Sequence, residues 1–363
     1  MQNFFQNKKI LITGHTGFKG SWLTQILLNW KAKIVGLSLA SIENPNLFSI
    51  LKLKGKIKNH FVDIRDFPKI KNILQKEKPE IVFHLAAQSL VREGYNDPLK
   101  TYSTNVLGTV NLLQAINNIN TVKSAVIITT DKVYENKEYI YPYREIDALG
   151  GYDPYSASKA AADIATQSYI QSFFNPKEFN KKHNTLIAVA RAGNVIGGGD
   201  WAPDRLIPDI IRAIYIKEKT IIIRNPRAIR PWQHVLEPLE GYLMLAKGLW
   251  EKQTQLVGAW NFGPDDASFV YVQDLVKTSL KIIRKGKLKI QRDQKKHEAQ
   301  LLKLDTTKAK TILGWQPRLT FLECLQFTLD WYKNYYQKPK RLAEITKFTN
   351  QQIQYFFQKS KTL

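Results

Sequence analysis

The most constraining feature of this chain is a glycine-rich stretch near its start, KKILITGHTGFKG at residues 8–20. The apolar run at residues 10–12 is typical of a buried parallel strand. Three glycines follow it at three-residue spacing: Gly14, Gly17 and Gly20. Large apolar residues then recur at helical spacing from Trp22 to Trp30. A strand, a glycine turn and a helix in this order predict a site where the helix N-terminus binds the pyrophosphate of a dinucleotide.

The rest of the chain alternates between strand-like and helix-like patterns. Buried-strand patterns cover residues 33–37, 56–62, 80–85 and 124–130, and a sixth ends at Arg191. Helical patterns cover residues 67–76, 105–116, 205–217 and 236–250. Strands and helices that alternate in this way predict a doubly wound parallel sheet, which binds ligands at the carboxyl ends of its strands.

Composition excludes several classes of protein. At 44% hydrophobic, the 363 residues are enough to bury a core. The single cysteine, Cys324, excludes an intramolecular disulfide and suits the cytoplasm, and we expect it in the core. No run is long enough to span a membrane, and no His, Asp and Glu grouping has metal-ligand spacing. We interpret the net charge of +23 as solvated lysine faces that favour anionic substrates, without a nucleic-acid site.

Charged and polar residues stand where the fifth strand ends, at Thr130, Asp131 and Lys132. Tyr155 and Lys159 follow at four-residue spacing, so they share one face of a helix. An ammonium close to a phenol favours the phenolate, and we therefore expect the pKa of Tyr155 to lie below its usual value of about 10. These residues predict a catalytic site in which Tyr155 is the base and Thr130 hydrogen-bonds the same substrate hydroxyl.

These motifs together resemble the extended short-chain dehydrogenase/reductase family, and within it the sugar-nucleotide 4,6-dehydratases that act on CDP-glucose. The resemblance runs from about Lys8 to about Tyr336. It rests on the G-x-x-G-x-x-G spacing and on long matching segments: HLAAQSLVREGYNDPLKTYSTNVLGTVNLL, TDKVYENKE, GGYDPYSASK, RAGNVIGGGDW and RPWQHVLEPL. It implies a Rossmann-type doubly wound parallel sheet with a smaller, mainly C-terminal, substrate-binding α/β domain.

The resemblance also implies a hydro-lyase reaction that serves deoxysugar biosynthesis, including that of the lipopolysaccharide O-antigen. Tyr155, with Lys159 beside it, takes the proton of the sugar 4-hydroxyl while the C4 hydride passes to NAD. A base then removes the C5 proton, protonated Asp131 helps the 6-hydroxyl leave as water, and the hydride returns to C6. We favour Lys132 as the base. Alternatively, Lys132 stays charged and stabilises the enolate, and Glu135 or another group takes the proton.

Binding residues follow from the same resemblance. The residues expected to bind NAD are Gly14, Thr16, Gly17, Phe18, Lys19, Gly20, Asp63, Ile64, Leu85, Ala86, Ala87, Gln88, Asn105, Tyr155 and Lys159. The residues expected to bind the nucleotide sugar are Gln88, Arg191, Asn194, Arg205 and Arg230, and the Arg230 guanidinium suits diphosphate oxygens. The second strand lacks the usual acid for the ribose hydroxyls, with Ser38, Ala40 and Ser41 there instead. NAD is still preferred over NADP, since no arginine takes the place of that acid.

We expect three parts along the chain. Residues 1–192 form the NAD-binding domain, whose sheet later segments complete, and residues 193–336 form most of the substrate-binding domain. Residues 337–363 form a basic amphipathic extension, either a helix on a partner subunit or a frayed tail. The expected assembly is a cytoplasmic homodimer or homotetramer. Two other functions stay open: another nucleotide-sugar epimerase, reductase or dehydratase of the family, or a non-catalytic, cofactor-binding regulator that binds nucleic acid.

Overall fold

The centre of the molecule is a seven-stranded parallel sheet with the strand order β11-β6-β5-β4-β1-β2-β3. The computed structural model describes residues 1–41, 44–216, 220–223, 225–290, 302–337 and 342–359. The strands of the sheet are β1 Lys9–Thr13, β2 Lys33–Ser38, β3 Lys58–Phe61, β4 Ile81–His84, β5 Ser124–Ile128, β6 Leu186–Ala192 and β11 Gly258–Phe262. The predicted doubly wound parallel sheet is confirmed.

The strands read as continuous apolar runs because both faces of the sheet are covered. Ile10 and Ile12 of β1 belong to the core on one face, and Leu11 between them belongs to the core on the other. In β5, Val126 and Ile127 divide between the two cores in the same way. Successive side chains of a strand point to opposite faces, so a strand that is buried on both sides needs an apolar residue at every position.

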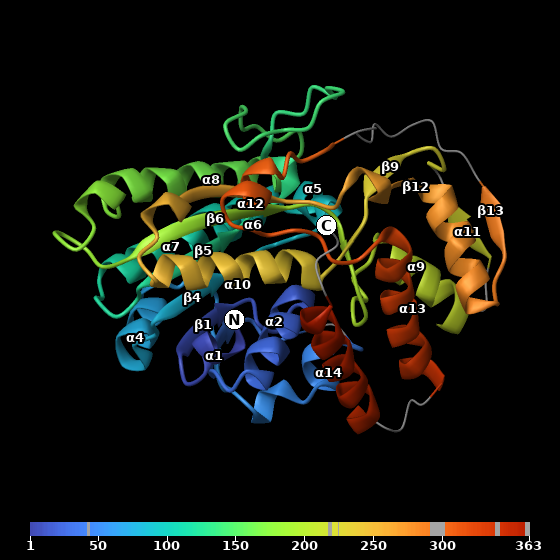
Figure 1. Ribbon diagram of the computed structural model, residues 1–363, viewed down its shortest axis with the longest axis horizontal. Coiled ribbons are helices and arrows are strands. Elements are labelled where there is room, and N and C mark those ends of the chain that lie inside the picture. Colours follow the sequence, from blue (N-terminus) through green and yellow to red (C-terminus); the bar gives the residue numbers. More distant parts are fainter. Residues whose placement is uncertain (42–43, 217–219, 224, 291–301, 338–341, 360–363) are drawn as a thin grey trace.

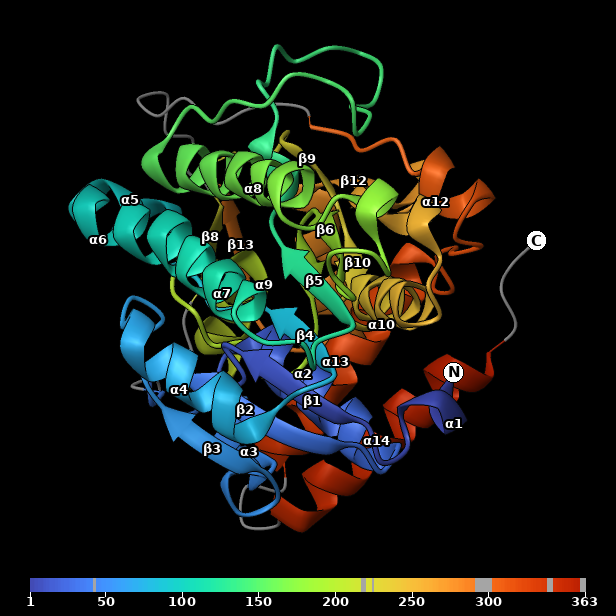
Figure 2. The same ribbon diagram turned by 90° about the vertical axis from the view of Figure 1, so that its left-hand side faces the viewer.

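Two layers of helices enclose the sheet. Helices α4 Phe67–Glu77, α7 Gly108–Asn117 and α8 Pro154–Ser172 cover one face, and α2 Phe18–Asn29 and α10 Leu236–Trp250 cover the other (Figures 1 and 2). Helices α5 Val91–Asn96 and α6 Pro98–Tyr102 precede α7, with a π-helical stretch at Ser103–Leu107 between α6 and α7. This layering places the N-terminus of α2 and the N-terminus of α8 beside the carboxyl ends of β1 and β5.

A smaller group of elements lies at one end of the sheet (Figure 1). Its short strands form three pairs: β7 Val195–Ile196 with β10 Gln233–His234, β8 Ile221–Ile223 with β13 Leu288–Ile290, and β9 Ile229–Pro231 with β12 Phe269–Tyr271. Its helices are α9 Leu206–Ile211, α11 Val272–Ile283 and α13 Phe321–Gln337. Because α10 and β11 return from this part of the chain to the main sheet, the two predicted domains share one core. Their boundary at residue 192 stays a prediction.

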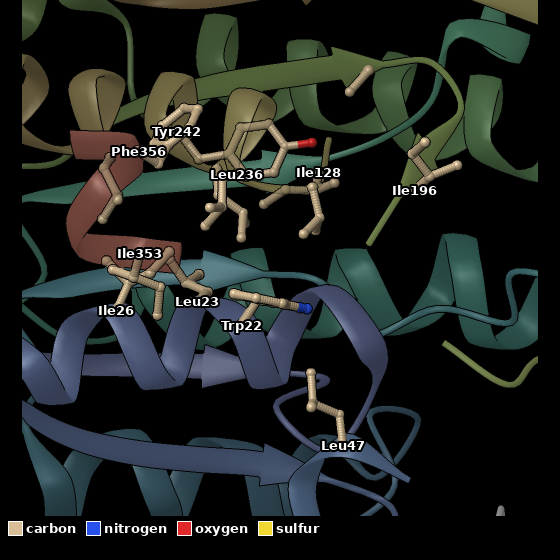
Figure 3. Close-up of a cluster of buried hydrophobic side chains, with 14 of the residues drawn as sticks. Trp22, Leu23, Ile26, Leu47, Ile128, Ile196, Leu236, Tyr242, Ile353 and Phe356 are labelled. Atoms are coloured by element: carbon tan, nitrogen blue, oxygen red, sulfur yellow. The ribbon is translucent and has the colours of Figure 1, made fainter. Parts of the chain in front are cut away.

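The C-terminal extension packs on its own chain. Helix α14 Leu342–Gln358 lies against α2, α13 and the short helix α3 Leu47–Ile50. Its buried residues Ile353 and Phe356 join the cluster that contains Leu23 and Ile26 of α2 (Figure 3). The frayed-tail alternative is wrong for the described part of this segment, because the apolar face of α14 is buried against its own chain, and contact of the helix with a partner subunit stays a prediction. Residues 338–341 and 360–363 of the extension lie outside the described residues.

The remaining short helices are α1 Gln2–Phe5 and α12 Thr307–Thr311. Cys324 is buried in α13, as expected, and burial raises the pKa of its thiol. Among the described helices, each one is too short or too polar to cross a bilayer. The same part of the chain holds no cluster of three His, Cys, Asp or Glu side chains arranged to ligate a metal.

Candidate active site

The glycine turn between β1 and α2 forms a cradle with an open helix end. Gly14 has a φ of +71°, and a Cβ there would lie 2.7 Å from the backbone nitrogen of Ala86. A Cβ on Gly20 would lie 2.1 Å from the carbonyl oxygen of Gly14, so only glycine allows the helix to start so close to the strand. Gly17 is the N-cap of α2, and because it has no side chain, α2 has no side-chain capping hydrogen bond at this end. The free N–H groups of the first turn therefore face the cleft, which fits an anionic pyrophosphate.

A single long cleft runs along the carboxyl ends of the strands and brings most of the predicted residues together. Those that line it are Gly14, Thr16, Gly17, Phe18, Lys19, Gly20, Asp63, Ile64, Leu85, Ala86, Ala87, Thr130, Asp131, Lys132, Tyr155, Lys159, Asn194, Arg205 and Arg230. Arg230 and Trp232 line it from the smaller group of elements. The cleft thus lies between the two predicted domains, at the edge of the sheet where a doubly wound fold binds its ligands.

The predicted catalytic residues meet where β5 ends and α8 begins. Asp153 caps α8 by accepting from the backbone N–H of Ser156 at 3.0 Å, which fixes Tyr155 in the first turn. Lys159 is buried one turn later and its Nζ donates to the carbonyl oxygen of Ile128 at 2.7 Å. The Thr130 hydroxyl donates to Oδ1 of Asp131 at 2.9 Å. These contacts hold the two strand-end residues and the two helix residues on one side of the cleft.

Burial dominates the titration of Tyr155 and contradicts our expectation for it. It raises the pKa of the phenol to about 12, against the opposing effects of a hydrogen bond with Thr130 and the charge of Arg205. Burial also lowers the pKa of Lys159 to about 8, against the stabilising charge of Asp163. The expected lowering of the Tyr155 pKa by Lys159 is wrong for the protein alone, because the loss of hydration outweighs the charges nearby.

Asp131 is buried and surrounded by cations. Burial raises the pKa of its carboxyl, while the charge of Lys132, the hydrogen bond from Thr130 and the charge of Lys19 oppose that rise. The pKa of Lys19 is lowered to about 8 by burial and by the charge of Arg205. Among the described residues, neither the Lys19 nor the Lys132 ammonium has a hydrogen-bond or ion-pair partner. Both ammonium groups therefore remain available to ligands in the cleft.

Comparison with known proteins identifies the family of this site. A family model described as GDP-mannose 4,6 dehydratase matches residues 11–328. The chain belongs to this dehydratase family. The match begins in β1 and ends within α13, so the family spans the cradle, the catalytic residues and both walls of the cleft.

Individual relatives within and around the dehydratase family share the fold but catalyse different reactions. The CDP-glucose 4,6-dehydratase of Salmonella typhimurium is 46% identical over 333 residues, which cover 92% of each chain. The dTDP-glucose 4,6-dehydratase of Streptomyces venezuelae, solved with NAD and TYD bound, has a TM-score of 0.77 at 22% identity and covers 92% of this chain and 99% of its own. The UDP-glucose 4-epimerase of Thermotoga maritima reaches 0.75 at 21% identity, with coverages of 90% and 99%. The fold is therefore common to dehydratases and epimerases, and the choice of reaction depends on the residues of the site.

Arg191 was expected to bind substrate, and the structure places it elsewhere. Its side chain is fully buried in β6, outside the residues that line the cleft, and it pairs with Asp163 of α8. Its Nη1 also donates to the hydroxyl of Tyr134 at 2.9 Å and to the carbonyl oxygen of Glu145 at 3.1 Å. Arg191 is therefore a structural residue behind the site, because its N–H groups donate to protein groups and not to the cleft.

Gln88 and Asn105 also differ from the expectation of direct ligand contact. The Gln88 amide bonds its own loop, donating to the hydroxyl of Thr101 at 2.9 Å and accepting from the backbone N–H of Leu90. Asn105 is fully buried and exchanges two hydrogen bonds with the Gln88 backbone, at 2.8 and 3.0 Å. Neither side chain lines the cleft. They shape the loop after β4 and hold its small residues against the cradle.

Other open alternatives are decided by position. Glu135 is exposed, lies outside the cleft lining and pairs with Lys137 at 3.3 Å, so it is not placed to act as the C5 base. Trp201 packs edge-to-face against Trp331, with ring centroids 5.7 Å apart, and does not line the cleft, whereas Trp232 does. His84 of β4 is buried, and its ring nitrogens hydrogen-bond Thr13 and Thr109, so it is a core residue.

The sequence did not lead us to Asp163, which connects Lys159 in the site to Arg191 behind it. Its carboxylate accepts from Arg191 and from the hydroxyl of Thr129 at 3.2 Å, and its charge acts on Lys159. The signal was present in the sequence, because Asp163 follows Tyr155 and Lys159 at a further four-residue step on the same helical face.

Proposed function

We propose that this chain converts CDP-D-glucose to CDP-4-dehydro-6-deoxy-D-glucose and water, as an NAD-dependent CDP-glucose 4,6-dehydratase of deoxysugar biosynthesis. The observation that carries the proposal is the placement of Asp131 and Lys132 at the end of β5, in the same cleft as Tyr155. Simple epimerisation at C4 needs no pair of groups for the elimination of water. The relative from Salmonella typhimurium, with its 46% identity, supports CDP-glucose as the substrate.

The residues of the cradle fit NAD as the cofactor. Gly17 leaves open space at the helix end, since a Cβ there would have only the Gly14 oxygen nearby, at 3.4 Å. Thr16 hydrogen-bonds Ser38 at 2.8 Å, so hydroxyls occupy the usual place of an acid for the ribose. Bound NAD would supply the acceptor for the C4 hydride and the donor that returns it to C6. Lys159 lines the cleft at the end of β5, and Asp63 and Ile64 line it after β3; they would hold the ribose and adenine ends of NAD.

Tyr155 is the group that receives the proton of the sugar 4-hydroxyl. Lys159 is fixed by the carbonyl oxygen of Ile128, and its charge would stabilise negative charge on the phenol oxygen; the same side chain would hold the cofactor ribose. The Thr130 hydroxyl lies beside Tyr155 and orients the same sugar hydroxyl.

Asp131 and Lys132 carry out the elimination. The ketone formed at C4 acidifies the C5 hydrogen, and Lys132 removes it as the neutral amine, which becomes an ammonium and returns the proton to C5 when the hydride has reached C6. Protonated Asp131 gives its proton to the 6-hydroxyl, which leaves as water. Burial favours the protonated form of this carboxyl, which suits a proton donor.

Arg230, Arg205 and Asn194 are the residues that we propose for substrate binding. Arg205 pairs with Asp200 at 2.8 Å, which orients its guanidinium at the cleft wall. Arg230 stands on β9 and lines the cleft, where a guanidinium can bind diphosphate oxygens.

We also propose that the enzyme works as a homodimer or homotetramer in the cytoplasm. Exposed apolar side chains on and between α5 and α8 support a subunit interface there: Tyr95, Leu99, Leu107 and Ile164. Light scattering at micromolar concentration tests this assembly, and a monomer would contradict it.

The activity test uses three nucleotide sugars. Purified protein is incubated with CDP-glucose, dTDP-glucose or GDP-mannose, with and without added NAD, and the 4-keto sugar is followed by its absorbance in alkali. We expect product from CDP-glucose alone. A Tyr155→Phe variant should lose the oxidation, whereas Tyr169→Phe, at the far end of the same helix, is the matched control. An epimer in place of the 4-keto sugar would contradict the proposal.

A further inference from the structure

The proposed reaction, on which this inference rests, has an unassigned proton. The sugar loses a proton from O4 when C4 is oxidised, and it gains a proton on O6 when water leaves. The C5 proton is removed and later replaced, so it does not contribute to the balance. The reaction can proceed without exchanging this proton with solvent only if the proton lost from O4 reaches the acid that protonates O6.

Three side chains of the cleft form a continuous path between those two positions. On one side Thr130 lies close enough to Tyr155 for its side chain to oppose the rise of the phenol pKa, and on the other its hydroxyl donates to Oδ1 of Asp131 at 2.9 Å. Thr130 and Asp131 are only 8% and 5% exposed, so bulk water has little access to this path. Oδ2 of Asp131 lies against Gly193, since a Cβ built on Gly193 would be 3.1 Å from this oxygen. Oδ1 is therefore the carboxylate oxygen at the end of the path.

We propose that Thr130 relays the proton lost at O4 from Tyr155 to Asp131, so that the oxidation of C4 loads the acid that later releases water. Asp131 is then the final proton acceptor of the first step as well as the proton donor of the second. Tyr155 and Thr130 end each step with the protons that they had at its start.

The bonds balance in the oxidation. The sugar O4–H bond breaks and its proton binds the Tyr155 oxygen, the Tyr155 proton passes to the Thr130 oxygen, and the Thr130 proton passes to Oδ1 of Asp131. The bonding pair of C4–H leaves with its hydrogen to NAD, and C4 becomes a ketone. In the elimination, the proton on Asp131 binds the departing 6-hydroxyl as the C6–O bond breaks, and Asp131 is a carboxylate again.

The charges around the path suit this cycle. Burial keeps Tyr155 protonated near neutral pH, so the phenol can accept a proton only if it passes its own onward. The ammonium group of Lys19 stabilises the Asp131 carboxylate at the end of the path. Burial of the same carboxyl favours its protonated form, so both states of Asp131 are accessible.

The decisive experiment measures where the proton goes. CDP-6-deoxy-D-glucose can be oxidised at C4 but has no 6-hydroxyl to eliminate. It is mixed rapidly with wild-type protein and NAD in weakly buffered solution with a pH-indicator dye. We expect the absorbance of reduced nicotinamide to rise without proton release. Asp131→Asn, which still accepts from Thr130 but cannot take up the proton, should release one proton for each NAD reduced. If the wild-type protein releases protons in step with NAD reduction, the relay is wrong, and this result does not depend on any variant.

A second measurement tests Thr130 itself on the same analogue. Thr130→Val keeps the side-chain shape but removes the hydroxyl, and it should slow NAD reduction by about 10²-fold. Thr130→Ser restores the hydroxyl and should stay within a few-fold of wild type. Adding Asp131→Asn to Thr130→Val should slow the step no further, because both changes break one path. Equal rates for Thr130→Val and Thr130→Ser would overturn the relay. If the wild-type protein forms 4-keto sugar normally, these failures concern the relay alone; if it forms none, the proposed function fails with it.

Discussion

The Arg191 guanidinium and the Asp163 carboxylate form a bidentate ion pair with no solvent exposure, 2.8 Å from Nε to Oδ2 and 2.9 Å from Nη2 to Oδ1. Burial disfavours the charge of Arg191, but the hydrogen bonds and charge of Asp163 outweigh it and raise the pKa of the guanidinium. The pair joins β6 to α8 directly behind the catalytic strand end. Through Tyr134, whose hydroxyl donates to Asn261 at 2.7 Å, it also reaches β11.

Arg191→Met should destabilise the fold strongly, because the Asp163 carboxylate would stay buried without its partner. The expected loss in the free energy of unfolding is about 3–5 kcal/mol. Urea denaturation at constant pH measures it. The matched control is Arg144→Met in the exposed pair with Asp147, at 3.2 Å, which should cost less than about 1 kcal/mol. Similar losses for the two variants would show that the buried pair has no special role.

The sequence could predict the fold and most of the cleft because their signals are local. The glycine spacing, the apolar runs and the Tyr155–Lys159 spacing each depend on neighbouring residues. The role of Arg191 does not, because an arginine at the end of a strand is equally typical of a ligand contact. Its burial depends on Asp163, which lies on another element.

The packing of the C-terminal extension also depends on residues far away in the sequence. Its helical periodicity was readable, and α14 forms. Besides the neighbouring α13, it covers α2 and α3, which lie about 300 residues earlier in the chain, and no local pattern indicates that second contact. The high pKa of Tyr155 was missed for a similar reason, because spacing reports a nearby charge but not the depth of burial.

Gly17→Ala should separate cofactor binding from folding. The backbone of Gly17 has a φ of −78° and a ψ of 174°, which alanine adopts without strain, and the position is exposed. A methyl group there would enter the space at the helix N-terminus where we propose the pyrophosphate binds. We expect the Kd for NAD to rise by about tenfold or more, measured by calorimetry, with the melting temperature of the free protein unchanged.

Gly55→Ala is the control for the loss of glycine, since a Cβ there meets no atom within 4 Å. It should leave the Kd for NAD as in the wild type. Unchanged NAD binding in Gly17→Ala would contradict the cradle as the pyrophosphate site.

Acid should destabilise the protein through three buried histidines. Burial lowers the pKa of His15 to about 4 and the pKa values of His84 and His234 to about 3. These side chains stay neutral in the folded protein, while the unfolded chain takes up protons below its usual pKa of about 6.5. Stability is therefore lost as the pH falls from about 6.5 towards 4. With all three protons taken up on unfolding, their contribution reaches about 4 kcal/mol per pH unit.

His234→Phe should reduce this slope by about a third, because one of the three protons is removed. The ring packs against Trp22 and Phe327, with centroids 5.8 and 5.6 Å apart, so phenylalanine suits the position. Its Nε2 has no hydrogen-bond partner among the described residues, and its Nδ1 accepts only a long bond of 3.4 Å from the backbone N–H of Leu236, so little is lost. Urea denaturation of both proteins across the acid range measures the two slopes. Parallel curves would contradict the role of His234.

Lys132→Ala should separate the oxidation from the elimination. The Lys132 side chain lines the cleft beside Asp131 and has no hydrogen-bond or ion-pair partner among the described residues, so its removal breaks no such contact, and the charge of Lys19 still acts on the Asp131 carboxyl. Oxidation at C4 should continue, because Tyr155, Thr130 and Lys159 are untouched. Removal of the C5 proton should fall by about 10²–10⁴-fold. In D₂O, wild-type product should carry deuterium at C5, as measured by NMR, and the variant should form little product.

Lys137→Ala is the matched control for charge. Lys137 also lines the cleft, five residues further along, but it pairs with Glu135 at the exposed rim. Its removal should leave deuterium incorporation and product formation close to wild type. If Lys132→Ala also dehydrates CDP-glucose at a near-normal rate, Lys132 is not the C5 base. Since Glu135 is turned to solvent, the base would then be sought among the other cleft residues that carry a titratable group next to Asp131, of which Lys19 is the first to test.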